Sequence, residues 1–111
     1  MTHGQLEAAA DRGALAAILE ARGRDQEARA VLFEVLATLE RVLGPEHYVV
    51  VAVLDRLASI ADRCGDRAGA AELVARSLKI RRRVLGDGHA AVQRTAAVLA
   101  RTRQDCEDRS R

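Results

Sequence analysis

The chain repeats itself with a period of 42 residues. Residues 42–47 (VLGPEH) recur as residues 84–89 (VLGDGH), which is an offset of 84 − 42 = 42 positions. The same offset superposes Gly23 on Gly65, Ala28 on Ala70, Leu36 on Leu78, and Leu57 on Leu99. A fixed period of this length indicates stacked copies of one supersecondary unit, each of which buries its apolar face against the next copy.

Composition and periodicity predict that this unit is a pair of antiparallel helices. Nearly half of the 111 residues are apolar, only 2% are aromatic, and strong helix formers dominate. Apolar residues recur every three or four positions, which is helical periodicity. The expected helices span about 5–22, 26–42, 47–63, 68–84 and 89–104. The prediction is a single all-α domain over 1–111, with repeat 1 at about 5–44, repeat 2 at about 47–86, a capping helix at about 89–104, and a frayed tail at 105–111.

Glycine and proline place the turns. Gly23 and Gly65 are expected to end the first helix of each pair, because glycine readily adopts the left-handed conformation found there. Pro45 stops the second helix, and Asp25 is expected to be the N-cap of that helix. Gly13 lies within the first helix, where we expect another backbone to approach closely.

The segment Gly65–Glu72 (GDRAGAAE) resembles the centre of a tetratricopeptide repeat (TPR), with glycine at the turn and a small residue, Ala70, five positions later. Residues 41–47 (RVLGPEH) resemble the 42-residue variant of the kinesin-light-chain type, common in bacterial proteins. The resemblance covers about 6–104. It implies an α-solenoid of two antiparallel helix-pair repeats plus a C-terminal capping helix, five helices in all.

The resemblance also implies a function, because TPR proteins bind extended peptides or helices in the concave groove lined by the first helix of each repeat. The expected binding residues at these positions are Glu20, Asp55, Ser59, Asp62, Arg63, Arg94 and Arg101. Relatives that grip a peptide C-terminal carboxylate use a set of lysines and asparagines in the groove, and that set is missing here. Asp55-Arg56 also replaces the paired asparagines of kinesin-like repeats, so we expect a mixed-charge groove for a protein or peptide partner.

Two alternatives remain open at this point. Two repeats leave the end faces of the stack only partly covered, so the chain is also a candidate homodimeric scaffold unit. A nucleic-acid or regulatory role would use the basic run Lys79–Arg83 and the C-terminal arginines, but the net charge of only +2 disfavours nucleic acid.

The sequence predicts no catalytic, cofactor or metal site. No nucleophile, base and acid are expected to converge. His47 and Cys64 would lie at opposite ends of one helix, about 25 Å apart at 1.5 Å per residue, which is too far for a shared zinc ion. Cys64 and Cys106 are expected to be free thiols of a cytoplasmic protein. No apolar run reaches the roughly 20 residues of a membrane span, and the N-terminus lacks a signal-peptide pattern. The initial Met and the polar ends favour a complete protein, and the Ala/Arg richness a bacterial one.

Overall fold

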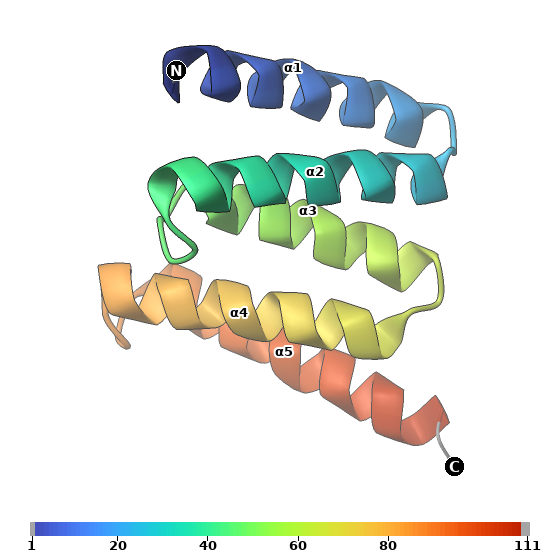
Figure 1. Ribbon diagram of the computed structural model, residues 1–111. Helices are drawn as coiled ribbons and strands as arrows, with labels where there is room; N and C mark the ends of the chain where they lie inside the picture. Colours follow the sequence, from blue (N-terminus) through green and yellow to red (C-terminus); the bar gives the residue numbers. More distant parts are fainter. Residues whose placement is uncertain (1, 110–111) are drawn as a thin grey trace.

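The protein is a stack of five helices that follow one another in chain order (Figure 1). The computed structural model describes residues 2–109. Its helices are α1 (Thr2–Ala21), α2 (Asp25–Leu43), α3 (Val50–Arg63), α4 (Arg67–Leu85) and α5 (Ala90–Arg109). Successive helices run antiparallel, and within this part of the chain each helix backbone packs only against its neighbours in sequence. The predicted all-α repeat architecture is confirmed.

Two helix layers form the stack, in keeping with its smallest dimension of 19 Å. In Figure 1, α2 and α4 lie in front, while α3 and α5 lie behind them. Small residues allow the helices of each pair to approach closely. These residues are Ala16 and Ala28 in the first pair and Ala58 and Ala70 in the second, and all four are buried.

One hydrophobic cluster joins α1, α2 and α3 and includes Ile80 of α4, and a second joins α3, α4 and α5. The side chains of Leu32, Leu54, Leu57 and Ile60 are fully buried. Helix α3 contributes to both clusters, so it is the centre of the core. The contacts are built from aliphatic side chains of moderate size, as the low aromatic content predicts.

The turn glycines adopt the conformation that the sequence predicts. Gly23 and Gly65 have φ values of +72° and +83°, and they form the short turns inside the two helix pairs. Gly44 and Gly86, at +97° and +87°, lie at the C-terminal ends of α2 and α4. Residues other than glycine are strained at such φ values, so the 42-residue spacing of these glycines fixes where the chain reverses.

The expected start of the third helix, at residue 47, was wrong by three residues. Helix α3 begins at Val50, because residues 45–49 form turns. The imidazole Nδ1 of His47 accepts a hydrogen bond from the backbone N–H of Val49 at 3.1 Å. His89 accepts one from Ala91 at 3.0 Å in the equivalent turn. The histidines therefore complete the turns before their helices.

Two further local predictions were wrong. The N-cap of α2 is Arg24, and Asp25 is the first helical residue. The carboxylate of Asp25 accepts hydrogen bonds from Arg63 instead of capping the helix. No backbone approaches Gly13 closely; its nearest neighbour is the side chain of Arg56, which reaches across from α3.

The last helix is longer than the sequence predicts. Helix α5 continues to Arg109, so residues 105–109 of the expected frayed tail are helical. Residues 110 and 111 lie outside the described residues.

Candidate functional site

An apolar groove runs between α1 and α3. It encloses about 690 Å³. The backbones of α1 and α3 do not contact each other, and the groove between them follows α1 from Leu6 to Ala17. Small side chains line its walls, and valines and leucines of α2 and α3 line its floor. The lining includes Leu6, Ala10, Gly13, Ala14, Ala17, Leu39, Val49, Ala52 and Val53.

Charged side chains bridge the two helices at the far end of this groove. Arg56 donates to the carboxylate of Glu20 at 2.9 Å and to the carbonyl oxygen of Gly13 at 3.4 Å. Arg63 pairs with Glu20 at 3.2 Å and with Asp25 at 3.2 Å. The hydrogen bond to Asp25 raises the pKa of Arg63 above its ordinary value. These contacts close one end of the α1–α3 groove.

A second, more polar cleft of about 320 Å³ lies between α3, α4 and α5. All three helices contribute both apolar and polar side chains to it. The lining comprises Asp55, Ala58, Ser59, Asp62, Ala70, Val74, Arg81, Arg94, Thr95, Val98 and Thr102. On α3, Ala52 and Arg56 line the first opening and Asp55 and Ser59 line the second, and their spacing of three or four residues places both openings on one side of that helix.

The acidic side chains of this cleft are already engaged with arginines. Asp55 accepts from Arg81 at 2.7 Å and 3.1 Å and from the buried hydroxyl of Ser77 at 2.8 Å. The hydrogen bond that Arg81 donates to Asp55 raises the pKa of Arg81. Asp62 accepts from Arg67 at 2.7 Å. The carboxylates therefore face positive charge from the protein itself.

The cationic side chains on α5 differ in this respect. Among the described residues, none forms a hydrogen bond or an ion pair with the guanidinium of Arg94 or of Arg101. The two residues are seven positions apart and lie on one side of the helix. Arg94 lines the cleft, whereas Arg101 is exposed beyond its rim.

The structure divides the seven predicted site residues into three groups. Asp55, Ser59, Asp62 and Arg94 line the α3–α4–α5 cleft. Glu20 and Arg63 pair with each other across α1 and α3. Arg101 lies in neither opening. Their role in binding stays a prediction.

Sequence reasoning overlooked several residues that shape the two openings. Arg56 closes the α1–α3 groove, and Arg81 reaches the α3–α4–α5 cleft from a helix expected to face the other side. The signal for Arg81 was its position four residues after Ser77 on α4, a spacing that places both on one helix face. Thr95, Val98 and Thr102 were missed because the register of α5 was extrapolated from the preceding repeat.

A family model described as tetratricopeptide repeat matches residues 6–82. The chain belongs to the tetratricopeptide repeat family. The match covers α1, α2, α3 and most of α4, and therefore both helix pairs. TPR domains generally mediate protein–protein interactions, and the family is typically non-enzymatic. No curated protein sequence matches this TPR chain significantly.

Other functional features of this TPR protein are few. Within residues 2–109, no three metal-binding side chains gather into a group that could hold an ion. Neither Cys64 nor Cys106 forms a disulfide in that range. Of the helices described, none combines the length and the apolar character that crossing a bilayer requires.

Proposed function

We propose that this TPR domain binds a partner peptide across the face that carries both openings. The observation that supports this most directly is the apolar α1–α3 groove, whose small side chains leave space for side chains from another molecule. Burying aliphatic groups there would contribute about 25 cal/mol per Å² of apolar surface removed from water. The groove therefore supplies affinity for an aliphatic segment.

On the same face, the α5 side chains would favour a peptide that carries negative charge. Arg94 and Arg101 lack partners among residues 2–109, while Asp55 and Asp62 are paired with arginines. An acidic residue in the peptide would meet a free guanidinium, whereas a basic one would compete with Arg81 and Arg67. We infer a peptide with aliphatic side chains at one end and a carboxylate at the other.

The same ion pairs argue for binding rather than catalysis. Glu20, Asp55 and Asp62 each accept from an arginine, so none is placed as a general acid or base. We also infer a cytoplasmic location, on the basis of the sequence pattern.

The ion pairs of the basic run on α4 support peptide binding over nucleic-acid binding, because an acidic side chain lies beside each of its cations. Lys79 and Arg83 pair with Glu46, Arg81 with Asp55, and Arg82 with Asp87. The hydrogen bond from Arg83 lowers the pKa of Glu46. Phosphate binding would require these pairs to break.

The test begins by selecting, from a displayed random peptide library, those peptides that bind the purified protein. Synthetic versions of the selected peptides are then titrated by calorimetry. Ala52→Arg places a bulky cation in the α1–α3 groove, and Arg94→Glu reverses the charge of the α3–α4–α5 cleft. Each should weaken binding by about tenfold or more.

The matched control is Ala37→Arg, which makes the same change at an exposed position of α2 outside both openings. It should leave binding unchanged. Selection that yields no peptide, or peptides that bind both groove variants as tightly as the wild type, would contradict the proposal.

A further inference from the structure

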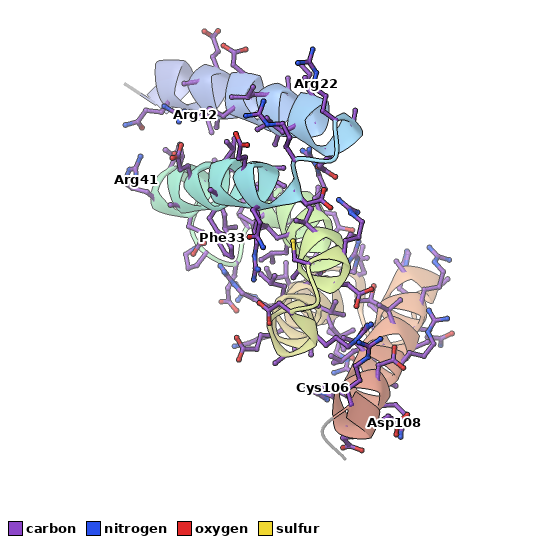
Figure 2. All side chains as sticks on the ribbon, turned by 90° about the vertical axis from the view of Figure 1, so that its right-hand side faces the viewer. Arg12, Arg22, Phe33, Arg41, Cys106 and Asp108 are labelled. Carbon is purple, nitrogen blue, oxygen red and sulfur yellow. The ribbon has the colours of Figure 1, made fainter. Side chains whose placement is uncertain are left out.

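Helix α1 carries exposed aliphatic side chains on the side opposite α2. Leu15 is 46% exposed and Ile18 is 53% exposed. Together with Ala8, Asp11 and Arg22 they form a stripe along the helix, which we call the α1 end face. The spacing of four, three and four residues from Asp11 to Arg22 places them on one side of the helix. Figure 2 shows Arg22 projecting away from the other helices.

The equivalent stripe in the second repeat is an interface. One 42-residue period after Leu15 and Ile18 are Leu57 and Ile60, and both are fully buried in the cluster that α3 shares with α2. A further period leads to Leu99, which is buried against α4. The positions equivalent to those by which α3 contacts the preceding helix, α2, are therefore exposed on the α1 end face.

The opposite end of the stack is adapted to water. In α3, Val51, Leu54, Ala58 and Ala61 are all buried. Their α5 equivalents are Gln93, Ala96, Ala100 and Arg103, which are small or polar and are exposed or half-buried. One end thus carries a solvated cap of the kind repeat proteins need, while the other keeps a leucine and an isoleucine in water.

Charged residues flank the exposed pair symmetrically. The carboxylate of Asp11 and the guanidinium of Arg22 form no hydrogen bond or ion pair with any described residue. Asp11 and Arg22 are centred between residues 16 and 17 of the helix, and so are Leu15 and Ile18. If a twofold axis passes through that point, Asp11 of one copy lies opposite Arg22 of the other, and Leu15 of one copy lies opposite Ile18 of the other.

We propose that the α1 end face binds the same face of a second copy of this chain, with the two α1 helices antiparallel. In this register Leu15 of each copy meets Ile18 of the other, and Asp11 of each copy pairs with Arg22 of the other. The two pairings follow from a single twofold axis, as an isologous interface requires. The aliphatic pairs form the centre and the ion pairs form the rim.

The first measurement is the mass of the wild-type chain by light scattering and sedimentation over a range of concentrations. The expected result is a dimer that dissociates on dilution. Leu15→Glu should raise the dimer Kd by about a hundredfold or more, because two carboxylates enter the centre of the interface. Val84→Glu is the control, since Val84 is equally exposed (55%) on α4 and should leave the dimer intact. Circular dichroism confirms that both variants fold.

Charge reversal tests the register itself. Asp11→Arg places like charges opposite each other in a homodimer, and so does Arg22→Asp. Each variant alone should dimerise about tenfold more weakly. An equimolar mixture should form a heterodimer as tight as the wild type, because each facing pair then joins one arginine to one aspartate. In a parallel arrangement like charges would already face each other in the wild type, so neither single variant would weaken association relative to it.

Three results would each overturn the proposal: a wild-type chain that remains monomeric at millimolar concentration, a dimer that survives Leu15→Glu, and a mixture that fails to restore association. The outcome is independent of peptide binding. Ala52→Arg should leave the dimer unchanged, and Leu15→Glu should leave the groove affinity unchanged, so either proposal can fail while the other holds.

Discussion

The guanidinium of Arg81 donates to both carboxylate oxygens of Asp55, at 3.1 Å and 2.7 Å, and so joins α4 to α3. The Arg81 side chain is only 17% exposed, whereas that of Asp55 is 41% exposed. The buried hydroxyl of Ser77 completes the contact. The pair is therefore partly protected from water and holds the second helix pair together.

Asp55→Ala should lower the free energy of unfolding by about 1–3 kcal/mol, because it leaves the mostly buried Arg81 without its anion. Urea unfolding followed by circular dichroism measures the change. The control is Glu34→Gln, since Glu34 pairs with Arg12 at a site where both side chains are more than half exposed. It should change stability by less than about 0.5 kcal/mol. If the two substitutions lowered the free energy of unfolding equally, the contact between Arg81 and Asp55 would contribute no more to stability than an exposed ion pair.

Two helical glycines should respond oppositely to alanine. A Cβ at Gly13 would meet only Arg56, at 3.9 Å, so Gly13→Ala should stabilise the protein by about 0.5–1 kcal/mol. A Cβ at Gly69 would overlap the carboxylate of Asp66. Gly69→Ala should displace that N-cap carboxylate and destabilise the protein by about 1 kcal/mol. Thermal unfolding of both variants decides the matter, and a stabilising Gly69→Ala would contradict the prediction.

The N-cap of α4 should make stability depend on pH at the acidic end. The carboxylate of Asp66 accepts from Arg29 and from the backbone N–H of Gly69 at 2.9 Å, and these contacts lower its pKa below the usual value. A lowered folded-state pKa stabilises the fold above the unfolded pKa of about 3.9, and this stabilisation is lost as the pH falls through the folded value.

Urea unfolding of the wild type and of Asp66→Asn at several pH values tests this dependence. Asparagine keeps a capping oxygen but has no charge. The wild type should be the more stable protein at pH 7, and the difference should shrink as the pH falls below about 4. A difference that is constant down to pH 2 would rule out the charge of Asp66 as the cause.

The same substitution at equivalent leucines should have very different costs. Leu57 is fully buried between α2 and α3, whereas Leu15 is 46% exposed. Leu57→Ala should cost about 2–5 kcal/mol through lost burial and the cavity left behind. Leu15→Ala, measured at a dilution where the chain is monomeric, should cost less than about 1 kcal/mol. Similar costs would mean that Leu15 has structural contacts on its outer side.

Most of the fold could be predicted because its determinants are local. The 42-residue period and the helical spacing of apolar residues fixed the order of the five helices. Gly23 and Gly65 marked the short turns, since a left-handed turn conformation is a property of one residue and its immediate neighbours. The family resemblance rested on the same local features.

The contacts between distant residues could not be predicted in this way. Arg56 reaches Glu20 over 36 positions, and Arg29 reaches Asp66 over 37. Long arginine side chains can meet any of several acids nearby, and only the relative placement of the helices decides which. For that reason the sequence assigned Glu20 and Arg63 to an open groove, while the structure places them in an ion pair.

Helix α2 meets α3 over a smaller contact than any other pair of successive helices in the described chain. Both openings on the binding face are bounded by α3, but only the α1–α3 groove spans this joint. A small rotation there would widen or narrow the groove while leaving each helix pair internally unchanged. The bridges of Arg56 and Arg63 oppose it on the groove side, and the ion pairs Arg29–Asp66 and Arg76–Glu40 also cross the joint. The domain is therefore expected to be elastic across the groove, with a width that adjusts to the bulk of the side chains it receives.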